Sequence, residues 1–242
     1  MTAPIYAIGD IHGQLAQLER ALELIHADGG PSPTVVFLGD YIDRGADSRA
    51  VIDRILNAKD AGQNWITLLG NHDRMFAWFL EDTPRHDPHL LVGYHWLHDR
   101  LGGRETLESY GVTFDDRTRL EDLHAETKAV VPDSHIRFLN GLLPMHQTTD
   151  LAFVHAGIKP GIPLDQQTEQ DLIWIRKPFH DHAGNHPKLI VHGHTPVDAA
   201  THYGNRVNLD TGAGYGKPLA VAVFEGRDCW LLTPEGRQPL TP

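Results

Sequence analysis

The sequence predicts an α/β fold in which two β-sheets pack together and helices cover their outer faces. Three observations predict it. Short apolar runs rich in β-branched residues end abruptly at polar motifs, helical patterns separate the first three of these runs, and strand patterns return near the end of the chain. Alternation of strands and helices favours a parallel sheet, and the late strands favour a second, mixed arrangement.

Five apolar runs are predicted to be buried strands. Each run is short, and a polar motif follows it directly along the chain. The runs cover residues 5–8, 34–38, 65–69, 151–154 and 189–191. Because open α/β sheets bind ligands at the carboxyl ends of their strands, we expect the polar residues that follow these runs to form a site.

Two amphipathic helices are predicted between the first three strands. Leu15, Leu18, Leu22 and Ile25 recur at helical spacing, and the glycines and proline at 29–31 end that pattern. The segment 48–59 places its apolar residues on one face in the same way. The order strand–helix–strand–helix–strand predicts three parallel strands at the start of the fold.

The segment 82–149 differs from the chain around it. It is rich in His, Asp and Arg, and helical stretches are predicted near 89–101, 104–110, 119–131 and 134–139. Beyond it, strands are predicted at 206–209, 219–224 and 229–232, with a hairpin turn at 225–228. We therefore expect a single domain over residues 1–242, with 82–149 as a helical insertion.

Composition excludes several functional classes. The chain has 242 residues and a formal net charge of −11, which argues against a nucleic-acid partner because such proteins need a basic surface. No apolar run approaches the length of a membrane helix, so no membrane partner is expected. The single cysteine, Cys229, excludes an intrachain disulfide and fits a reducing compartment, and a cytoplasmic location is expected.

The polar motifs contain the residue types that bind metals. They are 10–13 (DIHG), 40–45 (DYIDRG), 70–73 (GNHD), 155–157 (HAG) and 193–195 (GHT). Asp, Asn and His side chains without a thiolate suit manganese, iron or zinc better than a structural zinc site rich in cysteine. A carboxylate can bridge two such cations, and a water between them becomes a nucleophile at neutral pH. The 17 histidines in the chain, an unusually large number, fit metal binding and acid–base chemistry.

Glycines precede several of these candidates. Gly9, Gly39, Gly70 and Gly193 each stand directly before a candidate metal-binding residue. A residue without Cβ allows the backbone to turn sharply at the end of a strand and to approach an ion closely.

Together, the five motifs resemble the PPP branch of the metallophosphoesterases, which includes the serine/threonine protein phosphatases and their phage and bacterial relatives. The resemblance runs in order from Gly9 to about Gly212. It implies a four-layer sandwich of two mixed β-sheets flanked by helices. It also implies two divalent metal ions, with manganese as the first expectation and iron or zinc as alternatives.

The resemblance implies a role for each motif residue. Asp10 and His12 would hold the first metal, Asp40 would bridge, and Asn71, His155 and His194 would complete the second. The catalytic set that it implies is His72 as general acid, Asp43 as the residue orienting it, and Arg44 and Arg176 as phosphate ligands. Apart from the resemblance, Asn71 is a further candidate substrate contact. Tyr215, between two glycines, could line the substrate groove, and an aromatic side chain packed on the sheet is an equal alternative.

Each of these residues also has an ordinary structural explanation. Asp10 could cap a helix, and Asp43 and Arg44 could form a surface ion pair of little energetic value. The coincidence of all five motifs in order favours the functional interpretation. His192 shares a strand face with His194 but lies outside the motif, so we expect a neighbour rather than a ligand.

Three functions remain open on the sequence. The first is a phosphoprotein phosphatase that cleaves phosphate monoesters on Ser or Thr, with Tyr as a further class, and its partner would be a phosphoprotein or phosphopeptide. The second is a dinucleoside tetraphosphate hydrolase, a close relative. Relatives of that second type usually carry a small residue at the position of Asp43, so its presence favours the phosphatase. The third is a metal-binding scaffold without activity.

Overall fold

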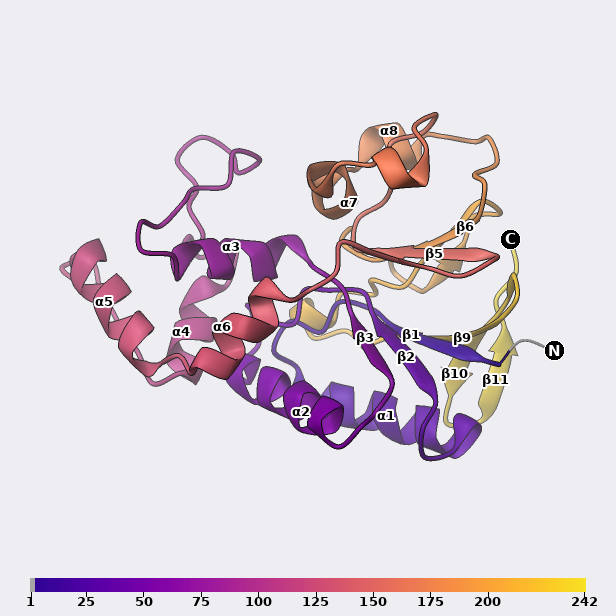
Figure 1. Ribbon diagram of the computed structural model, residues 1–242, viewed down its shortest axis with the longest axis horizontal. Helices are drawn as coiled ribbons and strands as arrows, with labels where there is room; N and C mark the ends of the chain where they lie inside the picture. The colour runs from indigo at the N-terminus through magenta and orange to yellow at the C-terminus, as the bar shows by residue number, and fades with distance from the viewer. Residues whose placement is uncertain (1–2) are drawn as a thin grey trace.

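Two β-sheets lie face to face between helices in the structure, a computed structural model that describes residues 3–242 (Figure 1). Helices α1 (Leu15–Gly29) and α2 (Ser48–Asp60) cover the outer face of the first sheet. Helices α7 (Glu169–Trp174) and α8 (Lys177–His180) cover the second. This arrangement confirms the predicted α/β sandwich of two mixed sheets flanked by helices.

The first sheet contains six strands in the order β11-β10-β9-β1-β2-β3. Strands β1, β2 and β3 are parallel, as the sequence predicted, and β9, β10 and β11 continue the sheet in antiparallel pairs. The bounds are β1 (Ile5–Ile8), β2 (Thr34–Phe37), β3 (Trp65–Thr67), β9 (Val221–Glu225), β10 (Asp228–Thr233) and β11 (Gly236–Pro239).

The second sheet contains five strands in the order β4-β5-β6-β8-β7. Strands β5, β6 and β8 are parallel, and β4 and β7 add an antiparallel strand at each edge. The bounds are β4 (Met145–Gln147), β5 (Leu151–Val154), β6 (Leu189–His192), β7 (Thr201–His202) and β8 (Arg206–Asn208). The parallel strands of both sheets therefore deliver their carboxyl ends to one region of the molecule.

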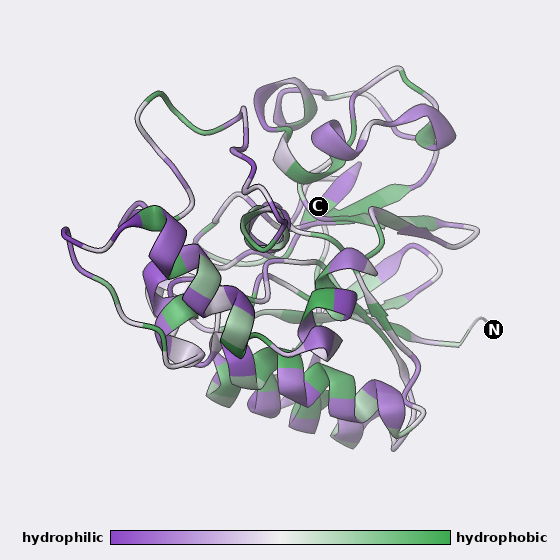
Figure 2. Cartoon of the chain, turned by 60° about the vertical axis from the view of Figure 1, so that its left-hand side comes forward, coloured by the Kyte–Doolittle hydropathy of each residue, from purple (hydrophilic) through white to green (hydrophobic). Residues whose placement is uncertain are grey.

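Alternation along the strands builds two apolar cores. Ala7 faces inward between the sheets, where Phe153 and Phe224 meet with ring centroids 5.9 Å apart. Tyr6 and Ile8, which point the other way, join the core beneath α1 and α2. Figure 2 shows the corresponding division of the helices into apolar and hydrophilic faces. All five of these side chains are at most 1% exposed, so the two sheets are fixed against each other and against the helices.

The segment after β3 is helical over a narrower range than expected. Its helices are α3 (Asn71–Phe79), α4 (Gly103–Ser109), α5 (Leu120–Val130) and α6 (Asp133–Asn140), with short 3₁₀ turns elsewhere at Leu164–Gln166 and Ala213–Tyr215. The helix predicted near 89–101 is wrong, because this stretch forms turns, and the end of the predicted insertion forms β4. Gly93 lies at φ +84°, which interrupts a helix. Across residues 3–242, no helix combines the length and the apolar character required to cross a bilayer.

Candidate metal centre and active site

The carboxyl ends of β1, β2, β3, β5 and β6 bring the predicted metal ligands together with His72, the predicted general acid. Ligand atoms of His12, Asp40 and His72 lie within 4.8 Å of one another. The same holds for Asp40, His155 and His194. All five side chains are buried. Asp40 belongs to both groups, which is the geometry that a bridging carboxylate requires.

Distances within the cluster connect the two sheets. Asp40 Oδ2 lies 3.6 Å from His12 Nε2 and 3.4 Å from His155 Nε2. Asn71 Oδ1 lies 3.0 Å from His155 Nε2 and 2.8 Å from His194 Nδ1. The backbone N–H of His194 donates to Asp10 Oδ2 at 3.0 Å, so the sixth predicted ligand joins the same cluster.

The tautomers of two histidines fit metal binding. Backbone carbonyls can only accept, so the Nδ1–H of His12 donates to Ile42 (2.8 Å) and that of His155 donates to Leu38 (2.9 Å). Each neutral imidazole then presents the lone pair of Nε2 to the cluster, as histidines on metals commonly do. His155 Nε2 thus faces the Asn71 oxygen, and because both atoms are hydrogen-bond acceptors, they repel each other. A bound cation would remove this repulsion, because both atoms could coordinate it.

Asp10 supports the same conclusion. Its Oδ1 is buried and has no hydrogen-bond partner. Burial raises the pKa of Asp10 well above its ordinary value, and the neighbouring Asp210 and Asp40 carboxylates raise it further. Burial likewise raises the pKa of Asp40 to about 8. Carboxylates gathered in this way need positive charge beside them, and divalent cations would supply it. The residues therefore fit the two metal ions that the motifs imply.

Backbone strain is concentrated at this site. Among residues 3–242, positive φ at a non-glycine residue occurs at five positions, and every one of them is a predicted site residue: His12, Asp40, Asp43, Arg44 and His194. Such conformations cost free energy and persist where the surrounding structure enforces them. The strained backbone conformations therefore fix the directions in which these five side chains point.

Two glycines explain how the backbone approaches so closely. A Cβ on Gly193 would lie 2.0 Å from Asp10 Oδ1, and a Cβ on Gly70 would lie 2.1 Å from Asp40 Oδ1. No larger residue fits either position without displacing a carboxylate. Both glycines therefore permit a close backbone approach at the end of a strand, here to a carboxylate.

His72 and Asp43 form the predicted pair. His72 Nδ1 donates to Asp43 Oδ2 at 2.6 Å, and Asp43 is fully buried. Burial raises the pKa of the Asp43 carboxyl to about 7, although hydrogen bonds from Thr106 and Trp96 act in the opposite direction. Trp96 and Thr106 lie in the predicted insertion, and no sequence signal marked them as part of the site.

Both predicted arginines point into the cluster. Arg44 contacts the Nε2 atoms of His12 and His72, the latter at 3.1 Å, and Arg176 Nε donates to His194 Nε2 at 3.1 Å. A guanidinium only donates, so each of these imidazole nitrogens accepts. Burial, and then the Arg44 charge, lower the pKa of His72 well below its usual value. His72 is therefore neutral while Arg44 occupies this position.

An exposed groove adjoins Arg44. The guanidinium lies 4.7 Å from the ring centroid of Tyr215, and this tyrosine is 62% exposed. The groove has a volume of about 410 Å³, and Arg100 and Glu105 contribute to its lining. Of the two positions considered for Tyr215, the exposed ring beside Arg44 is the one that the structure shows, and a role in substrate binding stays a prediction.

Two further carboxylates were missed as site residues. Asp73 accepts the backbone N–H groups of Asp40 (2.7 Å), Tyr41 (3.0 Å) and Gly70 (3.0 Å), so it holds two motif loops together. Asp73 belongs to the motif at 70–73, but no role of its own in the site was predicted for it from the sequence. Asp210 lies close enough to Asp10 for its charge to raise the pKa of that carboxyl. Its position after a predicted strand, at 206–209, was the available signal.

His192 belongs to a different group. It is fully buried, its ring lies 5.0 Å from that of Phe179, and its Nε2 accepts from Arg206 at 3.2 Å. His180 and His186 pack around the same phenylalanine, with centroid distances of 5.8 and 5.6 Å. We call His180, His186 and His192 the Phe179 histidine group. The prediction that His192 is a neighbour rather than a ligand agrees with this position.

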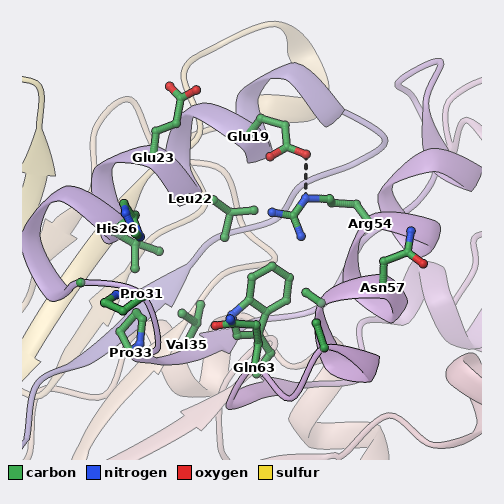
Figure 3. Close-up of a pocket in the computed structure, with 15 residues that line it drawn as sticks. Glu19, Leu22, Glu23, His26, Pro31, Pro33, Val35, Arg54, Asn57 and Gln63 are labelled. Carbon is green, nitrogen blue, oxygen red and sulfur yellow. Dashed lines mark hydrogen bonds and ion pairs between the residues drawn. The ribbon is translucent and has the colours of Figure 1, made fainter.

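A separate cavity of about 580 Å³ lies between α1 and α2 (Figure 3). Leu22 and Trp65 line its apolar part, and the Glu19 carboxylate accepts from Arg54 Nε at 2.7 Å across it. The cavity contains none of the motif residues. Its volume therefore does not identify it as the site of the predicted chemistry.

Comparison with known proteins agrees with this geometry. Residues 3–223 match the calcineurin-like phosphoesterase family. Among solved structures, a candidate diadenosine tetraphosphatase has a TM-score of 0.64 at 23% identity, with 100% of this chain and 95% of that chain covered. A cold-active protein-tyrosine phosphatase of a psychrophile, Shewanella sp., has a TM-score of 0.64 at 17% identity, with 100% and 81% covered. These structures share the fold. Since the family match spans most of its length, the chain belongs to the calcineurin-like phosphoesterase family.

Proposed function

We propose that this protein is a dinuclear metal-dependent phosphoprotein phosphatase. Two divalent cations, manganese in the first place, would be held by the six clustered side chains: Asp10, His12, Asp40, Asn71, His155 and His194. When bound, such ions polarise a phosphoryl oxygen and lower the pKa of a water molecule that they share. The other parts of the reaction fall to side chains of this chain.

The Asp43–His72 pair carries the proposal. Hydrolysis of a phosphoserine or phosphothreonine expels an alkoxide, which is a strongly basic leaving group and needs a proton as the P–O bond breaks. His72 Nε2 faces the cluster, while Nδ1 is held 2.6 Å from Asp43. The buried carboxylate orients the ring and stabilises its protonated form, so His72 is suited to deliver that proton.

Arg44 and Arg176 would bind the phosphoryl group. A guanidinium presents paired donors that match two phosphate oxygens, so both arginines, which already point into the cluster, could transfer their hydrogen bonds from imidazoles to the substrate. While Arg44 donates to His72 Nε2, this nitrogen cannot carry a proton. When Arg44 moves to the phosphate, Nε2 is free to take up a proton, and the negative charge of the substrate favours the imidazolium form. Phosphate binding would therefore convert His72 into the general acid.

The groove at Tyr215 supports a peptide partner. It is shallow, open to solvent, and contains charges of both signs, Arg100 and Glu105 among them. Such a surface can accept the chain on either side of a phosphorylated residue, with the phosphate directed toward Arg44. We propose a phosphoprotein or phosphopeptide as the substrate, with Ser and Thr esters before Tyr esters.

One observation favours dinucleoside tetraphosphate hydrolysis as a second candidate. Tyr215 offers an exposed ring, and Arg44 and Arg100 line the same groove, which would suit a nucleobase and a second phosphate. A nucleotide leaving group is far less basic than an alkoxide, so that reaction depends less on His72. The buried Asp43–His72 pair is therefore better explained by the phosphatase.

Parallel assays would separate the candidates. Metal-loaded protein would be supplied with a phosphoserine peptide, diadenosine tetraphosphate and p-nitrophenyl phosphate, and kcat/KM would be measured for each. We expect the phosphopeptide to exceed the dinucleotide. Faster turnover of the dinucleotide would replace the first proposal by the second. No turnover of any substrate with manganese, iron or zinc across the pH range would favour a scaffold without activity.

A further inference from the structure

The segment 96–106 of the predicted insertion reaches the Asp43–His72 pair, although it contains none of the metal-binding motifs. Two of its side chains donate hydrogen bonds to the Asp43 carboxylate. Trp96 Nε1 donates to Oδ2 at 2.9 Å, and Thr106 Oγ1 donates to Oδ1 at 2.6 Å. Both residues are at most 5% exposed. With His72, three donors therefore converge on one buried carboxylate.

Thr106 holds Asp43 at two points. Its hydroxyl donates to the carboxylate and accepts the backbone N–H of the same residue at 2.9 Å. The Ser48 hydroxyl accepts that N–H at 3.1 Å and lies 3.2 Å from the threonine oxygen. Asp43 has φ +71°, a conformation that a non-glycine residue adopts only under constraint. The two-point contact supplies such a constraint.

Trp96 fixes the other carboxylate oxygen. Its indole stacks on Phe76 and packs against Phe79, with ring centroids 4.9 and 5.0 Å away, so the N–H cannot turn aside. That N–H donates to the oxygen that accepts from His72 Nδ1. These hydrogen bonds prevent the Asp43 carboxylate from rotating about its Cβ–Cγ bond. The fixed carboxylate plane in turn fixes the orientation of the His72 ring that donates to it.

The backbone of the same segment supports Arg44. The N–H of Arg44 donates to the Gly102 carbonyl at 3.2 Å. A Cβ at Gly102 would lie 2.2 Å from that nitrogen, so this glycine permits the contact. The segment 96–106 therefore contacts both strained residues of the loop at 43–44, through side chains at one and through backbone at the other.

We propose that Trp96 and Thr106 are positioning residues for the general acid, holding Asp43 so that His72 points its Nε2 at the leaving oxygen. This inference rests on the proposed phosphatase activity. It gives the insertion a catalytic purpose in addition to its packing role, because deleting either donor would loosen the acid while leaving all six candidate metal ligands intact. A loosened acid matters most where the leaving group is a strong base.

The test uses full-length, metal-loaded protein and three variants. Trp96→Phe removes the indole N–H donor, Thr106→Val removes the hydroxyl donor, and Thr106→Ser keeps a hydroxyl at that position. We expect Trp96→Phe and Thr106→Val to lower kcat on a phosphoserine peptide by ~10–100-fold, a fraction of the full acid contribution, with KM nearly unchanged. On p-nitrophenyl phosphate, whose leaving group needs little protonation, the loss should stay within about threefold. Thr106→Ser keeps the hydroxyl and should retain at least a third of wild-type kcat on the peptide.

A matched control is Thr127→Val. Thr127 is another fully buried threonine of the insertion, and its hydroxyl donates to the Leu123 carbonyl within α5, away from the acid pair. Its replacement should affect both substrates equally and weakly. Metal content and thermal unfolding are measured for every variant. Trp96→Phe keeps the aromatic packing, so it provides a second test if Thr106→Val does not fold.

The outcomes separate this inference from the proposed function. Equal losses on both substrates, an unaffected peptide kcat, or a Thr106→Ser variant as impaired as Thr106→Val would overturn the positioning role while the phosphatase activity stands. A wild-type protein that cleaves neither substrate would overturn the proposed function and this inference with it. Selective loss on the peptide, restored by serine, supports both.

Discussion

Two groups of histidines meet near the end of β6, and only one of them is suited to metal. His192 and His194 are two residues apart, yet His192 belongs to the Phe179 histidine group and His194 to the metal cluster. In the cluster, Asp40 lies 3.4–3.6 Å from two imidazoles. In the Phe179 group, the charged partner of His192 is Arg206, at 3.2 Å.

The comparison teaches that buried imidazoles alone do not make a metal site. Both groups contain histidines whose pKa is lowered by burial, as for His155 and His186, each to about 4. Neutral imidazoles can bind a cation, but carboxylates supply the charge that holds it. Arginines contact imidazoles in both groups, so the buried carboxylates, Asp10 and Asp40 among them, are what distinguish the metal cluster. Thus the unusual number of histidines in the sequence is explained only in part by metal binding.

The largest expected effect comes from removing the carboxylate that distinguishes the metal cluster. Asp40→Asn should lower bound metal below one ion per chain and lower kcat by ~10⁴-fold or more, about 5.5 kcal/mol, because both ions lose their shared ligand. Metal analysis by mass spectrometry and steady-state kinetics would measure the two quantities. Full metal content in the variant would refute the bridging role.

The next effect separates acid chemistry from metal binding within the cluster. His72→Asn should keep both ions and lower kcat on a phosphoserine peptide by ~10²–10⁴-fold, since positioned acid catalysis is typically of this size. The same variant should lose much less activity on p-nitrophenyl phosphate. If metal content falls together with activity, His72 would have to be counted among the ligands.

The comparison predicts a different outcome for His192. His192→Asn removes the acceptor for Arg206 and should destabilise the fold by ~1–3 kcal/mol, the usual cost of leaving a buried donor unpaired. Metal content should not change. Urea unfolding and metal analysis of the same sample would test both statements. Loss of an ion would mean that the two histidine groups are not independent.

The smallest expected effect concerns acid stability. Burial, then the neighbouring His182 and Arg206, lower the pKa of His186 from 6.5 to about 4. The unfolded chain therefore binds a proton at higher pH than the folded one, so this contribution is complete above pH 6.5 and is lost as the pH falls toward 4. His186→Phe should make the free energy of unfolding fall ~1–3 kcal/mol less between pH 7 and pH 4. The exposed His26→Phe is the control, and an unchanged pH dependence in His186→Phe would contradict the assignment.

Much of the fold and site was predictable because its signals are local. The strands at 5–8 and 151–154 were predicted at the bounds that the structure shows, since each apolar run ends at a metal-binding motif. The absence of a helix near 89–101 was not predicted, because its apolar residues suggest a periodicity that Gly93 interrupts. Trp96 and Thr106 could not be predicted either. Their contacts with Asp43 span 53 and 63 residues, and only tertiary packing brings them there.

The hydrogen bond from His194 to Asp10 joins residues 184 positions apart, and this separation constrains how the protein assembles. Half of the proposed ligands, those up to Asp40, leave the ribosome more than 110 residues before His155, so no ion can find its full coordination sphere during early synthesis. Closing so long a loop is entropically costly and slow. Ion uptake would consequently be a late step of maturation, and a folded chain that has not yet bound metal would have the Arg44 charge beside its clustered carboxylates.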